Sequence, residues 1–173
     1  MEINYSAAGV AKIQDQFLMV REKKINSKSF PDAPKDVPII FCAFPGGKCE
    51  GNTIEDTLIT ELKQETTAIV TAVGRHLCTV TKIDNRENVR IVKEFYECSI
   101  DSSIPLTTPK DPDGAAQAAM LLDKEQALLQ AAKHPDPLYR VVLKDIIEGN
   151  TGFHYTHESD SNGKYNKLWI NRL

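Results

Sequence analysis

The sequence lacks the features that mark several specialised classes of protein. It has no basic start followed by a long apolar run, and no stretch approaches the roughly 20 apolar residues that a membrane helix needs. Its four cysteines form no CxxC pair, which argues against a zinc site or a disulfide framework; they are Cys42, Cys49, Cys78 and Cys98. We therefore expect reduced thiols, a cytoplasmic location and no contact with a membrane.

Positive charge is not in excess either. The chain has 21 Lys and Arg residues against 24 Asp and Glu residues, so its formal net charge is -3 at pH 7. A protein without a broad basic field is poorly suited to hold the backbone of a nucleic acid. Nucleic acid is thus a disfavoured partner, and a phosphate-bearing ligand should be bound at a local site.

What is present is the pattern of one mixed α/β domain. A chain of 173 residues is long enough to bury one core and too short for two ordinary domains. Strand-like runs occupy residues 7–20 (a hairpin that turns at 14–16), 38–44, 75–83 and 89–100. Helical periodicity covers 53–67, 123–132 and 138–149, while 115–122 fits a strand or a helix start. We predict a domain over 1–149 and a tail over 150–173, which forms a short hairpin packed on the domain around a turn at 161–164.

Two glutamates lie on the apolar face of the helix predicted over 53–67. With a rotation of about 100° per residue, Glu61 and Glu65 fall within about 100° of arc of Leu58 and Leu62. Residues four apart on a helix are about 5–6 Å from each other, close enough to share one divalent cation through their oxygens. The alternative is that both side chains simply spread outward at the border of a wide apolar stripe, and the helix by itself leaves both interpretations open.

The stretch that contains this helix, FPGGKCEGNTIEDTLITELKQETTAIV, resembles the Nudix box, G-x5-E-x7-R-E-U-x-E-E-x-G-U with U aliphatic. The resemblance continues in order through the opening hairpin, the strand pair ending in KEFYECSI, the AAMLL segment and the last helix, and it stops at Asn150. It implies a Nudix-like α/β/α sandwich with a mixed sheet. It also implies that Mg²⁺ or Mn²⁺ is bound, and that the pyrophosphate linkage of a nucleoside diphosphate derivative is hydrolysed.

The resemblance assigns roles to particular residues. Glu61 and Glu65 match glutamates that bind metal in the family, and Gln64 stands with them as a candidate catalytic residue. The main-chain carbonyl of Gly46 is a candidate third metal ligand, and Gly47 is its alternative. Gly46, Gly47 and Lys48 are the candidate residues for binding the substrate phosphates.

Several departures from the box leave the activity open. Gln64 replaces a glutamate, Thr60 replaces the arginine, Thr67 replaces the closing glycine, and Asn52 stands near the expected upstream glutamate. An amide oxygen can bind a metal, but it carries no negative charge and is no base at neutral pH. The sequence is therefore compatible with a metal-dependent hydrolase, the interpretation we favour, and with a nucleotide-binding or regulatory module that has lost turnover. A homodimer is one option for its oligomeric state.

Other residues have ordinary structural explanations beside their functional ones. Asp111, Asp113 and Gln117 are candidates for a base or an extra metal ligand, and Phe95 and Tyr96 could stack on a base or fill the core. Arg90 and Lys93 could contact phosphates or be solvated charges. His154, His157 and Glu158 fit a surface tail, and Trp169 is expected to anchor that tail.

Overall fold

The computed structural model describes residues 1–25, 37–107 and 115–173. Its elements are β1 (Glu2–Ile13), β2 (Gln16–Ile25), β3 (Pro38–Ala43), β4 (Gly46–Lys48), α1 (Ile54–Thr66), β5 (Val70–Asp84), β6 (Val89–Ile100), β7 (Ala116–Leu122), α2 (Lys124–Ala132), α3 (Pro137–Glu148), β8 (Phe153–Ser159) and β9 (Tyr165–Arg172). The strands of the described residues form one sheet in the order β3-β2-β1-β6-β5-β8-β9, with β4 on β1 and β7 on β2. The β1–β6 and β5–β8 pairs are parallel and the others are antiparallel, so the sheet is mixed.

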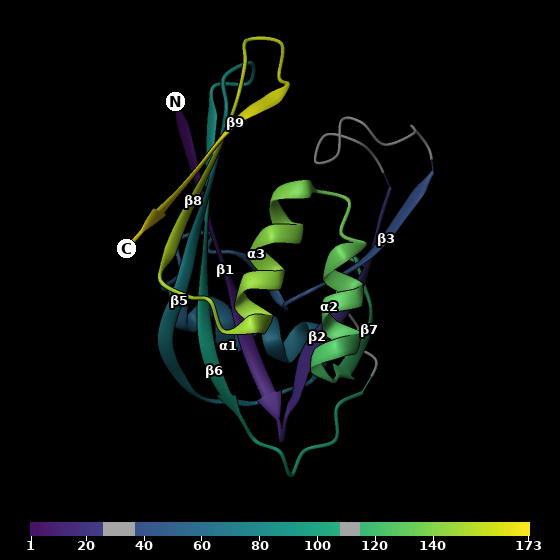
Figure 1. Cartoon of the computed structure of the whole chain (residues 1–173). Coiled ribbons are helices and arrows are strands. Elements are labelled where there is room, and N and C mark those ends of the chain that lie inside the picture. The colour runs from purple at the N-terminus through teal and green to yellow at the C-terminus, as the bar shows by residue number, and fades with distance from the viewer. Residues whose placement is uncertain (26–36, 108–114) are drawn as a thin grey trace.

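The sheet lies between two helical layers. Figure 1 shows α2 and α3 on the near face of the sheet and α1 behind it. The near face buries aromatic and aliphatic side chains such as Phe95 and Tyr155 against Leu138 and Leu143 of α3. On the far face, Leu58 and Leu62 pack against small residues of β1. The α/β/α sandwich predicted from the sequence is confirmed.

The sheet separates into two parts where β1 leaves β2. These strands pair only through Lys12–Phe17 and Ile13–Gln16, next to the turn that connects them. Farther from the turn, β1 pairs with β4 and β6, whereas β2 pairs with β3 and β7. The short strand β4 thus takes the position beside β1 that β2 has vacated, directly before α1 in the chain.

The three helices begin and end within one residue of the stretches predicted from the sequence. Thr53 is the N-cap of α1, and its hydroxyl accepts a hydrogen bond from the Asp56 N–H at 3.0 Å. Helix α2 starts with a capping box formed by Asp123 and Gln126. The segment 115–122, which fitted either a strand or a helix start, contains the strand β7.

The main differences from the expected elements lie in the first hairpin, in β5 and at the C-terminal end. The hairpin expected over 7–20 extends over 2–25, because β1 begins at Glu2 and β2 continues to Ile25. Strand β5 begins at Val70 rather than at Arg75, because irregularities in its pairing with β6 let it continue across Gly74 and His76. The two strands that flank the turn at 161–164 are β8 and β9, and β8 pairs in parallel with β5. The C-terminal hairpin therefore extends the main sheet.

A buried ion pair connects β5 to the start of α3. The Lys82 ammonium lies 2.7 Å from Asp136 Oδ2, and the two side chains are 14% and 7% exposed. Asp136 Oδ1 also accepts a hydrogen bond from the Leu138 N–H at 2.9 Å, so the same carboxylate caps α3. Removal of the lysine would leave a buried carboxylate without its cation.

We predict that Lys82→Met lowers the free energy of unfolding by about 3 kcal/mol or more, because an uncompensated buried charge is costly. The matched control is Arg75→Met, which breaks the exposed Arg75–Glu97 pair (2.9 Å, side chains 64% and 49% exposed) and should cost less than about 1 kcal/mol. Urea denaturation of the three proteins measures both values. If both variants lost the same small amount of unfolding free energy, the result would contradict a stabilising role for the Lys82–Asp136 pair.

Candidate functional site

Helix α1 carries both predicted glutamates into contact with β4. Leu58 and Leu62 are fully buried on the far face of the sheet and fix the rotation of the helix. In that orientation Glu65, one turn after Glu61, is only 7% exposed, and Glu61 is partly buried. The glutamates are thus held inward, and the alternative in which both spread outward into solvent is wrong.

The two glycines before Lys48 allow this close approach. The Gly46 N–H donates a hydrogen bond to Glu65 Oε2 at 2.9 Å. A Cβ added at Gly47 would overlap the Glu61 carboxylate, and one added at Gly46 would overlap the main chain of Ala7 and Ala8. Any residue with a side chain would therefore displace β4 or the glutamates. The structure brings Glu61, Glu65, Gly46 and Gly47 together, as the sequence predicted.

The environment of Glu65 disfavours its charged form. Burial, followed by the nearby charges of Glu22 and Glu61, raises the pKa of Glu65 from about 4.5 to about 8, although the Gly46 N–H and Lys93 oppose the increase. Glu22 lies on β2, is 9% exposed and has the Lys24 ammonium 3.4 Å away. Glu22 was not among the residues predicted from the sequence; the signal was a glutamate just beyond a predicted strand, separated only by Arg21 from the apolar run FLMV.

Lys93 is the cation that faces these carboxylates from β6. Burial lowers the pKa of its ammonium, while Glu22, Glu65 and Glu61 raise it in that order. The ammonium also lies 5.6 Å from the ring centre of Phe95 and 5.8 Å from that of Tyr139. Lys93 is therefore a half-buried charge next to the carboxylates, and the interpretation of it as an ordinary solvated charge is wrong.

The oxygen donors of this site suit a divalent cation that is bound through only a few protein ligands. The described residues contain no group of three or more His, Cys, Asp or Glu side chains arranged to bind a metal ion. They do contain two carboxylates beside the main chain of the Gly-Gly segment, and hard oxygen donors of this kind suit Mg²⁺, which commonly keeps several of its waters. A cation here would also offset the repulsion that contributes to the raised pKa of Glu65.

Three other candidate residues are exposed and are not held by this contact. Gln64 is exposed on α1, Gln117 is exposed on β7, and Lys48 is exposed at the end of β4. Asp111 and Asp113 fall outside the described residues. The roles predicted for Gln64 and Lys48 remain predictions.

The remaining aromatic and histidine residues have structural partners. Phe95 is buried in the core, and Tyr96 packs edge-on against His76 with ring centres 5.0 Å apart. In the hairpin, His154 Nε2 is 2.9 Å from the Thr81 hydroxyl. Trp169 is 43% exposed, so the expectation that it anchors the tail is wrong.

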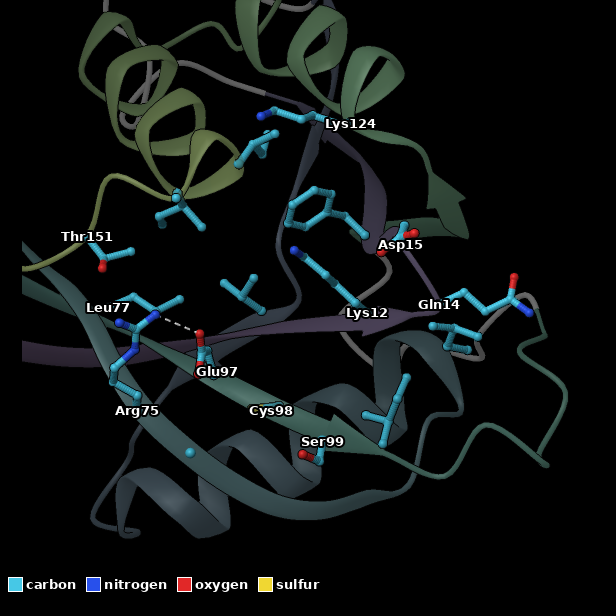
Figure 2. Close-up of a pocket in the computed structure, with 18 of the residues that line it drawn as sticks. Lys12, Gln14, Asp15, Arg75, Leu77, Glu97, Cys98, Ser99, Lys124 and Thr151 are labelled. Carbon is cyan, nitrogen blue, oxygen red and sulfur yellow. Dashed lines mark hydrogen bonds and ion pairs between the residues drawn. The ribbon is translucent and has the colours of Figure 1, made fainter.

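One cavity lies at a different place. It has a volume of about 930 Å³ and lies between the α2–α3 layer and the strands β1, β5 and β6 (Figure 2), where Lys12, Arg75, Glu97 and Lys124 surround an apolar floor that includes Leu77. A smaller one of about 360 Å³ adjoins Lys48 and Cys49. Neither is lined by Glu61 or Glu65, so cavity size does not identify the carboxylate site.

Solved structures share this fold. No protein-family profile and no curated protein sequence matches the chain. A MutT protein from Bacillus halodurans is 14% identical with a TM-score of 0.62, and the alignment covers 97% of both chains. A Nudix hydrolase from Nitrosomonas europaea is 17% identical with a TM-score of 0.61, over 87% of this chain and 92% of that one. The ORF135 protein of E. coli is 17% identical with a TM-score of 0.61, over 86% and 91%.

These likenesses show that the chain has the fold of the Nudix hydrolases, as its sequence predicted. At such identities they show the fold alone. The alignment with the Bacillus halodurans protein covers 97% of the chain and so reaches into the C-terminal hairpin, where the sequence resemblance had stopped. Among the described residues, no helix has the length and apolar character needed to cross a membrane.

We predict that Glu65 makes the protein less stable as the pH rises. The folded state binds the proton of the Glu65 carboxyl more tightly than the unfolded chain does, because the pKa is higher in the folded state. The contribution of this proton to the free energy of unfolding is complete below about pH 4.5 and is lost as the pH approaches 8. The slope is limited to about 1.4 kcal/mol per pH unit for one group. Denaturation in chelator between pH 5 and 8 should show this loss in the wild type and in the exposed control Glu55→Gln, and a flatter profile in Glu65→Gln. The same slope in all three proteins would contradict the raised pKa.

Proposed function

We propose that this protein hydrolyses the pyrophosphate linkage of a nucleoside diphosphate derivative with the help of Mg²⁺ or Mn²⁺. The observation that carries the proposal is the contact of Glu61 and Glu65 with the Gly46–Gly47 segment. In this contact two carboxylates lie against the main chain of the glycine segment. The fold shared with MutT and Nudix hydrolase structures supports the same reaction class.

Glu61 and Glu65 would hold the cation, with the main-chain carbonyl of Gly46 as a further ligand. Such a cation polarises a phosphoryl oxygen and lowers the pKa of a bound water. The Gly46 N–H fixes the orientation of the Glu65 carboxylate through the 2.9 Å hydrogen bond. Because burial and neighbouring carboxylates raise the pKa of Glu65 to about 8, binding of the cation would be coupled to the loss of its proton near neutral pH.

Lys93 and Lys48 are the cations suited to the substrate phosphates. Both pair in register with Ser6 of β1, Lys48 from β4 and Lys93 from β6, so the three side chains share one face of the sheet. With a divalent cation between the glutamates, the charge of Lys93 would be less fully compensated and available to an anionic ligand. We infer that the substrate phosphates lie between the α1 carboxylates and this pair of lysines.

The alternative is a nucleotide-binding or regulatory module without turnover. It is favoured by the exposed Gln64 and Thr60, which replace a glutamate and an arginine of the box. We also infer a cytoplasmic location, with the four cysteines reduced, since all four thiols are buried and free.

We predict that Glu61→Gln and Glu65→Gln each lower kcat/KM by about 100-fold or more, because each removes a charged ligand of the cation. The assay is a panel of nucleoside diphosphate derivatives with Mg²⁺ or Mn²⁺, followed by phosphatase-coupled phosphate release. Glu55→Gln, exposed in the first turn of the same helix, should keep wild-type activity. Mn²⁺ should raise the Tm of the wild type and of Glu55→Gln, and do so less in the two site variants.

The outcomes separate the two functions. Activity lost in the site variants and retained in Glu55→Gln supports the hydrolase. A wild type that turns over no member of the panel but binds a nucleotide in calorimetry without metal would overturn the hydrolase and establish the binding module.

A further inference from the structure

Strand β9 presents an apolar edge at one end of the sheet. It is the last strand in the order β3-β2-β1-β6-β5-β8-β9, and Figure 1 shows its C-terminal end clear of the three helices. Three consecutive residues at its centre are large and exposed: Leu168 by 45%, Trp169 by 43% and Ile170 by 49%. An edge of this kind is usually shortened, charged or covered in a monomeric protein, because it can pair with another strand.

The hydrogen bonding of β9 shows which of its residues face outward. The Leu173 N–H donates to the Gly152 carbonyl at 2.7 Å, on the side of β8. Main-chain groups alternate in direction along a strand, so those of Trp169 also face β8, and those of Leu168 and Ile170 face away from it. In the described residues no strand pairs with this outer side. The outward N–H and C=O groups therefore belong to the two aliphatic residues.

We propose that β9 pairs in antiparallel fashion with β9 of a second copy of this chain, around a twofold axis at Trp169. Antiparallel pairing requires that opposed residues share a face and a hydrogen-bonding direction. With the axis at Trp169, Leu168 and Ile170 of the two copies face each other as hydrogen-bonded pairs. The two Trp169 residues then form a pair without hydrogen bonds, in which the side chains are closest.

The sequence of β9 is compatible with this self-pairing. Lys167 falls opposite Asn171 of the second copy, so no like charges meet over residues 167–171. Moving the axis to Ile170 would instead place Leu168 opposite the charged Arg172. The Trp169 register pairs aliphatic with aliphatic and aromatic with aromatic residues, and it opposes no like charges over 167–171. A second copy thus fits this edge, and the sheet would continue through the dimer.

Disulfide trapping tests the register. The Cα atoms of an antiparallel pair without hydrogen bonds are about 4.5 Å apart, within the range that a disulfide spans. The four native cysteines are buried, so Trp169→Cys adds the accessible thiol. Mild oxidation should convert most of this variant to a covalent dimer. Leu168→Cys on the same strand and Ile40→Cys on β3 at the other end of the sheet should form little covalent dimer.

Sedimentation equilibrium of the unmodified protein gives the second readout. The wild type should dimerise, and the double variant Leu168→Lys/Ile170→Lys should be monomeric, because it opposes like charges at both hydrogen-bonded pairs. Circular dichroism checks that the exposed substitutions leave the fold intact. A monomeric wild type at several hundred micromolar overturns the proposal. So does a dimer that survives the double substitution, or equal crosslinking of Trp169→Cys and Leu168→Cys.

Discussion

The close approach of α1 to β4 is the contact on which the candidate site depends. Leu58 and Leu62 set the rotation of the helix by packing beneath the sheet, and that rotation directs Glu61 and Glu65 at the Gly46–Gly47 segment. The segment can lie there because β1 pairs with β2 over only two residues and leaves room for β4. Packing of apolar side chains thus brings two carboxylates close to the main chain of Gly46 and Gly47. Larger residues at these two positions would prevent this close approach.

Electrostatics give this contact its chemical character. A carboxylate that is buried next to Glu22 and Glu61 holds its proton to about pH 8, although the Gly46 N–H and Lys93 favour its charged form. The charges of the site are nearly compensated inside the protein, with Lys24 beside Glu22 and Lys93 facing the α1 carboxylates. A divalent cation would change this balance by favouring the charged form of Glu65 and by releasing Lys93 toward an anionic ligand. Metal binding, proton loss and phosphate binding would then be linked.

Sequence patterns predicted the parts of the fold that local chemistry determines. The helical periodicity over 53–67, 123–132 and 138–149 and the apolar stripe of α1 are local signals, and the structure confirms the elements they mark. The parallel pairing of β8 with β5 and the early start of β5 depend on contacts between distant segments, which periodicity does not encode. For the same reason the sequence identified the Glu61–Glu65 pair but missed Glu22, which reaches the site from another strand. It also placed Trp169 as an anchor, whereas that residue lies on an open edge.

Manganese binding to glycine variants tests the central claim, that the cation site depends on the approach of Glu61 to Gly47. A Cβ at Gly47 would overlap the Glu61 carboxylate, whereas one at Gly74 would meet its nearest atom at an ordinary 3.5 Å. In an electron paramagnetic resonance titration, the wild type and Gly74→Ala should bind Mn²⁺ with similar affinity. Gly47→Ala should remain folded, and its affinity for Mn²⁺ should be at least about 10-fold lower. Equal affinities in all three proteins would contradict the account.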